Sequence, residues 1–243
     1  MPVFGKKKRR LVSCALLLFA AGVGAAAQPV PHVEDNIIVS ELKPSLAIEV
    51  DKGFTYLGRH PIRIRDVAAG ERLVFAELQE HRARRLFIIQ IEGFLPGIDN
   101  EYRYNLTRSP VVAGYPFRSN SFAFDLDKSV AGNPGGESAS TQKFLLDRGI
   151  AAPKQWMMWR SLTVTSADKR NEMILFYVEN VFDHDITISD IYDPDTNKDT
   201  PVWKTMQIDL EQRANASYRL ARLNEDKQPL QGSWQRVPLS LTP

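Results

Sequence analysis

Two oppositely charged residues stand in apolar surroundings, at a spacing that could bring them together. Arg160 shares the even positions of an aromatic-rich segment with Trp156 and Met158, and Glu179 interrupts the next apolar segment. If the turn between the two segments is centred at 169–170, Arg160 and Glu179 lie opposite each other on neighbouring strands. Desolvating such a pair is costly, so a specific reason must retain it.

Two interpretations follow from that pairing. The first is a satisfied structural bridge between the strands, which is the one we favour. The second is a polar cavity beside the hairpin that binds a small ligand. In that case the ligand-binding residues are predicted to be Trp156, Met158, Arg160, Tyr177 and Glu179.

A second candidate is a metal loop at 193–199. Oxygen-bearing side chains alternate there, as they do where a turning backbone directs every second side chain toward a calcium ion. The ligands would be Asp193, Asp195, Asn197 and Asp199. The letters resemble the first half of an EF-hand or dockerin-type loop, but Lys198 replaces the turn glycine and Lys204 replaces the closing glutamate. The alternative is a polar turn, and apart from calcium no cofactor is expected.

No complete catalytic constellation is visible. Ser140 and Lys143 match the S-x-x-K motif of penicillin-recognising enzymes, but the companion motifs are missing and a helix cap explains the serine. A hydrolase would have to assemble residues scattered along the chain. The candidates for such acid–base chemistry are Asp125, Glu179, Asp183 and His184.

These residues must be positioned by a long hairpin. Residues 155–166 are rich in aromatic and β-branched side chains, and residues 172–181 are mostly apolar. The connection 167–171 is small or charged, as hairpin loops are. Apolar or alternating runs separated by short turns predict further antiparallel strands, at 62–65, 73–76, 86–91, 102–105, 121–125 and 186–192.

Helices are expected in fewer places. Residues 140–148 have a serine cap and a stop at Gly149, which favours a short helix. Residues 205–223 fit either a strand or a helix, and their content of Glu, Gln, Arg and Ala favours the helix slightly. The proline- and glycine-containing segment 109–136 is the least regular part, and long irregular segments are often functional.

The first 27 residues have the three parts of a secretory signal peptide. A basic cluster at 6–10 precedes an apolar run at 11–23, and small residues at 25–27 allow cleavage after Ala27. The apolar run is too short to span a bilayer as a stable helix, which disfavours an N-terminal membrane anchor. We therefore expect a bacterial periplasmic or secreted protein with no transmembrane segment after signal removal.

Removal of the leader changes the charge and the cysteine content. The whole chain has 31 Lys and Arg against 29 Asp and Glu, so losing five basic residues leaves 26 against 29, a formal charge of −3. A mildly acidic domain has no electrostatic reason to bind nucleic acid. The only cysteine is Cys14 in the leader, so disulfides and thiolate chemistry are excluded from the mature chain.

The sequence thus predicts one exported α+β domain at 28–243, with residues 28–36 as a disordered lead-in. It should have a mainly antiparallel, twisted sheet with one to three helices packed on one face. The favoured function is non-catalytic binding of a small, partly apolar ligand or an envelope partner. A hydrolase with dispersed acid–base residues is one alternative. The other is a structural or assembly protein of the envelope that contacts its partner through Trp156, Trp159 and Trp203.

Overall fold

A computed structural model describes residues 31–40, 44–193, 195–196 and 198–239. Its largest element is a six-stranded sheet in the order β4-β5-β6-β11-β10-β9, with every neighbouring pair antiparallel. The strands are β4 (Thr55–Ile64), β5 (Ala68–Gln79), β6 (Arg82–Phe94), β9 (Arg118–Asp125), β10 (Gln155–Val164) and β11 (Asn171–Asn180). The leader predicted at 1–27 lies outside the described residues.

A second, four-stranded sheet has the order β1-β2-β3-β12 and a small two-stranded sheet joins β7 to β8. These strands are β1 (His32–Glu34), β2 (Ile37–Ser40), β3 (Leu46–Val50), β7 (Val111–Val112), β8 (Tyr115–Pro116) and β12 (Tyr218–Arg222). Residues 32–34 therefore pair as a strand, in contrast to the disordered lead-in expected there.

The helices are short except for one. They are α1 (Leu126–Gly132), α2 (Glu137–Leu146), the 3-10 helix η1 (Val181–His184), α3 (Ile188–Ile191) and α4 (Pro201–Ala216). Helix α4 begins where Thr200 caps it, its hydroxyl accepting from the amide of Trp203 at 3.2 Å, with Pro201 at the first position. Both features are typical of helix starts. Within the described ranges, no helix has the length and apolar character needed to cross a membrane.

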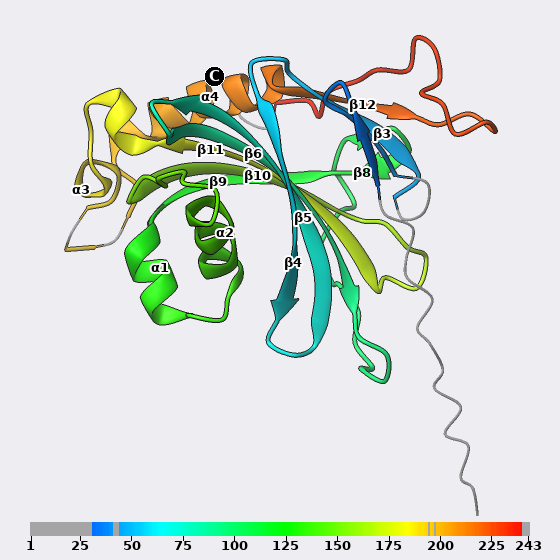
Figure 1. The fold of residues 1–243 in the computed structure, drawn as a ribbon, viewed down its shortest axis with the longest axis horizontal. Coiled ribbons are helices and arrows are strands. Elements are labelled where there is room, and N and C mark those ends of the chain that lie inside the picture. Colours follow the sequence, from blue (N-terminus) through cyan, green and yellow to red (C-terminus); the bar gives the residue numbers. More distant parts are fainter. Residues whose placement is uncertain (1–30, 41–43, 194, 197, 240–243) are drawn as a thin grey trace, which may run out of the picture.

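The six-stranded sheet is covered on both faces (Figure 1). Even-numbered residues of β5, β6, β10 and β11 point to the side that carries α1 and α2, which we call the α2 face. Odd-numbered residues point to the side that carries α4 and the four-stranded sheet, which we call the α4 face. This alternation is the period of two that any strand imposes on its side chains.

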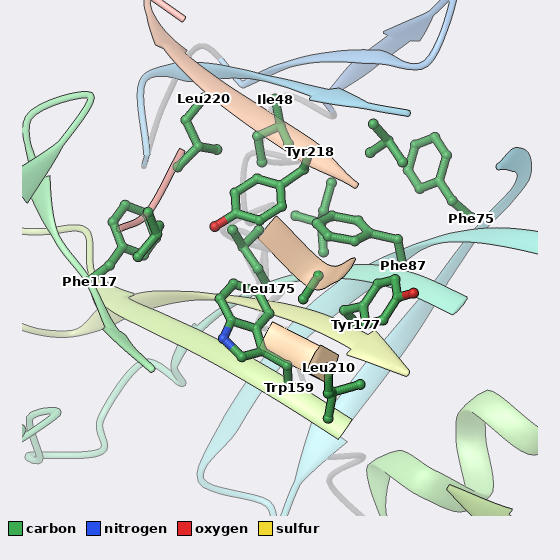
Figure 2. Packing of buried hydrophobic residues seen from close by; sticks show 14 of the residues in the cluster. Ile48, Phe75, Phe87, Phe117, Trp159, Leu175, Tyr177, Leu210, Tyr218 and Leu220 are labelled. Carbon is green, nitrogen blue, oxygen red and sulfur yellow. The ribbon is translucent and has the colours of Figure 1, made fainter. Parts of the chain in front are cut away.

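The larger apolar cluster lies on the α4 face and joins the two sheets to α4 (Figure 2). Tyr218 of β12 contacts Phe87 of β6 and Trp159 of β10, with ring centroids 5.3 and 5.7 Å apart. Leu210 of α4 is fully buried in the same cluster. Aromatic pairs at these separations add to the stability that burial gives.

The predicted hairpin is formed by β10 and β11, but its register differs from the expected one. Met157 pairs with Glu179 and Arg160 pairs with Phe176, which centres the connection on Asp168. The turn contains Lys169 with a positive φ of 55°. The expected pairing of Arg160 with Glu179 is therefore wrong.

The α+β class and the mainly antiparallel sheet are confirmed. The ambiguous segment 205–223 contains both elements, since the end of α4 is followed directly by β12. Residues 186–192, which alternate like a strand, contain helix α3, which a capping box at Thr187 and Asp190 initiates. Residues 102–105 are not in a strand either, and the segment 109–136, expected to be irregular, contains all of β7, β8, β9 and helix α1.

One glycine permits close contact between β5 and β6. Gly70 pairs with Glu92, and a Cβ atom added at Gly70 would lie 2.1 Å from the carbonyl oxygen of Ile91 and 2.7 Å from Cβ of Glu92. Both distances are far inside van der Waals contact. The missing side chain at Gly70 therefore leaves the space in which Glu92 is placed.

Substituting Gly70→Ala should lower the free energy of unfolding by about 2 kcal/mol or more, because the backbone of β6 must move to admit the methyl group. Gly132→Ala is the matched control, since an added Cβ at Gly132 meets nothing within 4 Å. Chemical denaturation should show the control within about 0.5 kcal/mol of the parent chain. Similar losses for both variants would contradict this account of Gly70.

Candidate functional site

A cleft of about 920 Å³ opens on the α2 face. It is bordered by the sheet, by the start of α2 and by residues 95–110, which form neither helix nor strand and are called the 95–110 segment below. Its lining combines aromatic rings with ionisable groups, a composition common in small-molecule sites. The principal side chains are Arg72, Gln90, Glu92, Phe94, Tyr102, Tyr104, Phe122, Phe124, Glu137, Met158, Arg160, Glu172 and Phe176.

Two glutamates form the centre of this cleft. Glu172 of β11 and Glu92 of β6 are direct cross-strand partners, and both point to the α2 face. Only 3% of Glu172 and 5% of Glu92 is exposed. Like charges directly opposite each other on neighbouring strands repel, and burial strengthens the repulsion. The pair is therefore stable only if at least one carboxyl group holds a proton.

The protonation follows from the surroundings of Glu172. Burial, followed by a hydrogen bond to Glu92 and the charge of Glu92, raises the pKa of Glu172 to about 8. At neutral pH Glu172 is then mostly a neutral acid beside the Glu92 carboxyl group. Within the described part of the chain, no hydrogen-bond donor reaches the buried Oε2 of Glu172.

Two tyrosines from the 95–110 segment approach the glutamates. The Tyr102 hydroxyl donates to Oε1 of Glu92 at 2.8 Å, and the Tyr104 hydroxyl lies close enough to Glu172 for each group to shift the pKa of the other. Their rings stack with Phe94 in a row, with centroids 4.5 Å apart for Phe94 and Tyr102 and 6.3 Å for the two tyrosines. Burial and the nearby carboxyl groups raise the pKa of both hydroxyls, so both remain donors.

The 95–110 segment is fixed to the hairpin turn by Arg170. Its guanidinium donates to the carbonyl oxygens of Ile98 at 2.6 Å, Leu95 at 3.1 Å and Asn100 at 3.3 Å. The amide of Tyr102 also donates to the carbonyl of Lys169 at 2.9 Å. A segment without helix or strand therefore holds its tyrosines in a defined place.

A buried arginine attaches α2 to the sheet. Arg72 donates to Oε1 of Gln90 at 2.6 Å, to Thr141 Oγ1 at 2.7 Å, and to the carbonyl and Oε1 of Glu137 at 3.0 and 2.9 Å. Gln90 in turn donates to Oε1 of Glu137 at 2.7 Å and to Oε2 of Glu92. The result is one connected network, which is the condition for burying polar groups without large cost.

The predicted ligand-binding residues divide between the two faces of the sheet. Met158 and Arg160 line the cleft, and Arg160 donates from Nε to Asn120 at 3.1 Å. Trp156 is 2% exposed and belongs to the apolar cluster under α2. Tyr177 and Glu179 lie on the α4 face, because odd and even residues of β11 point opposite ways. A single cleft lined by all five residues is therefore wrong.

Glu179 belongs to a structural ion pair with a different partner. Arg213 of α4 donates to its two oxygens at 2.7 and 2.8 Å, and His184 Nε2 lies 2.9 Å from Oε2. Burial favours the neutral acid, but hydrogen bonds from His184, Arg213 and Tyr177 outweigh it and lower the pKa of Glu179 to about 2. The Glu179 carboxylate connects β11 to α4. It is not among the residues that line the cleft.

The loop at 193–199 has the geometry of a polar turn. Oδ1 of Asp193 accepts hydrogen bonds from the amides of Asp195 and Thr196 at 3.1 and 2.8 Å and from the Thr196 hydroxyl at 2.9 Å. Asn197 lies outside the described residues. Tyr192 and Asp199 form an isolated antiparallel bridge across the loop. In the part of the chain that the structure describes, no three His, Cys, Asp or Glu are placed to hold a metal ion.

The dispersed acid–base candidates do not form one site. Asp125 caps α1 by accepting from the amide of Lys128 at 2.9 Å. Asp183 accepts from Arg84 at 3.0 Å, and His184 is bound to Glu179 on the α4 face. Ser140 and Lys143 of the S-x-x-K match are engaged with His60 and Asp147 respectively.

Sequence reasoning missed the residues at the centre of the cleft, Arg72, Gln90, Glu92, Tyr102, Tyr104 and Glu172. A signal was present for two of them. Gln90 and Glu92 occupy alternate positions in the otherwise apolar part of β6 at 86–94, which places two polar groups on one face of a central strand. Glu172 opens β11 next to the turn, where a polar residue is ordinary, and gives no such signal.

Comparisons with protein-family models, curated proteins and solved structures were made for the chain. None gives a match.

The pH dependence of stability should reveal the proton on Glu172. Folded Glu172 keeps its proton while the unfolded chain loses it above the usual 4.5, so its stabilising contribution falls as pH rises from about 4.5 to about 8. Glu172→Gln cannot titrate. In urea unfolding, the free energy of unfolding of the variant should therefore rise relative to that of the parent chain by up to about 1.4 kcal/mol per pH unit in this window.

The exposed Glu225→Gln is the matched control, because it removes a carboxyl group that is not among the residues lining the cleft. A Glu172→Gln curve parallel to that of the parent between about pH 5 and pH 8 would show that Glu172 is ionised throughout.

Proposed function

We propose that this chain is an exported, non-catalytic domain that binds a small, partly apolar molecule in the cleft of the α2 face. The observation that carries the proposal is the junction of an aromatic wall with a buried carboxyl pair at the base of a 920 Å³ space. Apolar walls with a few converging polar groups are the usual construction of small-ligand sites.

The size and the two kinds of lining support a ligand with a polar end and an apolar body. Phe122 and Phe124 on β9 contact each other with centroids 6.1 Å apart, and both line the cleft. Glu92 and Glu172 supply the polar end. Export, to the periplasm or the exterior, rests on the leader-like sequence at 1–27 and belongs to the same proposal.

The carboxyl pair also favours a second candidate, a hydrolase in which two acids share a proton and activate water. Pairs of carboxyl groups with separated pKa values perform acid–base chemistry in aspartic proteases. Against this, Tyr102 and Gln90 already bind both oxygens of Glu92. Those contacts leave Glu92 little freedom to act as a base, so binding is the better-supported function.

The burial of the three tryptophans argues against an assembly function in which they contact a partner chain. Trp156, Trp159 and Trp203 are 2%, 1% and 1% exposed. Side chains so deeply buried in the two apolar clusters have no surface to offer a partner chain.

A fluorescent probe for apolar sites tests the binding function. N-phenyl-1-naphthylamine should bind the purified chain with enhanced emission, and Phe122→Ala should weaken its binding by about tenfold by removing one aromatic wall. Phe182→Ala is the matched control, because Phe182 is 50% exposed and is not among the residues lining the cleft. Its affinity should stay within about twofold of the parent.

Absence of probe binding, or equal losses in the two variants, would count against a ligand site in this cleft. Native mass spectrometry of the chain purified from its own source provides an independent check, since a bound small molecule adds a defined mass that denaturation removes.

A further inference from the structure

We propose that the ligand of the cleft carries a protonated amine, which binds between Glu92 and Glu172 and displaces the proton that the two carboxyl groups share. The inference rests on the proposed binding function. It adds the chemical class of the ligand and the release of a proton on binding.

The first argument is an unmet acceptor. Oε2 of Glu172 is buried, belongs to a residue that is 3% exposed, and meets no donor among the described residues. Both oxygens of Glu92 accept hydrogen bonds, Oε1 from Tyr102 and Oε2 from Gln90. While Glu172 holds its proton, its hydrogen bond to Glu92 satisfies the pair. Once Glu172 is ionised, a buried acceptor is left without a donor, which is costly, and an ammonium group supplies three N–H donors and a positive charge.

The second argument is the charge around the pair. Besides Glu92 on β6 and Glu172 on β11, the elements that face the cleft contribute Glu137 from α2, Arg72 from β5, Arg160 from β10, and Arg63, Arg65 and Asp66 from the β4–β5 turn. Tyr102 and Tyr104 remain neutral donors, as described above. Arg72 already donates four hydrogen bonds, and Arg63 is paired with Asp66 at 2.8 Å.

Among the described residues, Arg65 and Arg160 are the cations of the cleft lining for which no ion pair is found, and Arg160 is the one beside the aromatic rings. Its guanidinium lies 5.6 Å from the ring centroid of Phe122, at the aromatic side of the cleft, and its charge reaches Tyr104. Arg160 thus lies on the aromatic side of the cleft, whereas Arg72, which is near Glu92, already donates its hydrogen bonds to Gln90, Thr141 and Glu137. This arrangement favours a cationic group at the glutamates.

The third argument is the aromatic surface itself. Phe94, Tyr102, Phe122 and Phe124 line the same space as the carboxyl pair. Aromatic faces attract ammonium groups and also accept the apolar body of a ligand. Carboxylates combined with aromatic rings thus suit an arylalkylamine better than a purely apolar or an anionic molecule.

The proton balance is simple. In the free cleft Glu172 is a carboxylic acid at pH 7, because burial and Glu92 raise its pKa to about 8. When R–NH₃⁺ binds, Glu172 ionises, its proton leaves to solvent, and the carboxylate accepts from the ammonium group. Amine affinity should therefore rise with pH, by up to about tenfold per unit below pH 8, while a neutral ligand shows no such dependence.

The experiment compares three probes of matched shape, 2-phenylethylamine, 2-phenylethanol and 3-phenylpropionate, on the full folded chain. Isothermal titration in phosphate and in MOPS at pH 7 measures affinity and the number of protons released. The amine should bind at least about tenfold more tightly than the alcohol, and the anion most weakly. The amine should release close to one proton and the alcohol none.

Variants locate the effect. Glu172→Gln should abolish proton release and weaken the amine by at least about tenfold, while the alcohol stays within about twofold. Arg160→Gln should strengthen the amine several-fold and weaken 3-phenylpropionate. The exposed Glu225→Gln should change neither. The pH dependence in the parent chain provides the same test without relying on any variant to fold.

The outcomes separate the two proposals. If none of the three probes binds and N-phenyl-1-naphthylamine also fails, the binding function itself is overturned. If the alcohol or the anion binds as well as the amine, or if the amine binds without releasing a proton, the cleft binds ligands but the amine inference is wrong. Weaker amine binding in Arg160→Gln would overturn it too.

Discussion

Strand β11 is covered by neighbours on both edges and on both faces, and much of the architecture follows from that. Every residue from 172 to 180 is buried, with β6 and β10 on its edges. A polar side chain in such a strand cannot reach water, so it must be satisfied where it stands. Strand β11 has two such carboxyl groups, at Glu172 and Glu179, on opposite faces.

The two glutamates are satisfied in opposite ways. Glu179 meets Arg213 and His184 on the α4 face and remains a carboxylate at low pH. Glu172 meets the carboxyl group of Glu92 and the hydroxyl of Tyr104 on the α2 face, and holds its proton. The first arrangement is closed, because each oxygen has a donor. The second is incomplete, and it opens to a cleft of about 920 Å³.

The sequence was informative about elements and much less so about their register. The alternation of Trp156, Met158 and Arg160 placed them correctly on one face of β10. The partner of Arg160 depended on the turn, and centring it on Asp168 changed the pairing by three residues. An odd displacement exchanges the faces of the partner strand, so Glu179 went to the α4 face. Turn geometry is decided by local contacts that composition does not specify.

The centre of the site was hidden for a related reason. Glu92 and Glu172 are 80 positions apart, and only the pairing of β6 with β11 makes them neighbours. Tyr102 and Tyr104 alternate as strand residues would, but the 95–110 segment forms no ladder and is held by Arg170. Long-range pairing and a side chain bound to carbonyl groups leave no periodic trace in the sequence.

The attachment of the 95–110 segment by Arg170 has a consequence for how the site could evolve. The two tyrosines owe their position to three carbonyl contacts made by one guanidinium in a hairpin turn. The loss of conformational entropy that comes with ordering this segment therefore occurs during folding and not on ligand binding. Ligand recognition then depends on Arg170, a residue of the β10–β11 turn that is not among those lining the cleft. Substitutions in the short β10–β11 turn would therefore displace the two tyrosines and abolish the site, even if every residue that lines the cleft stayed the same.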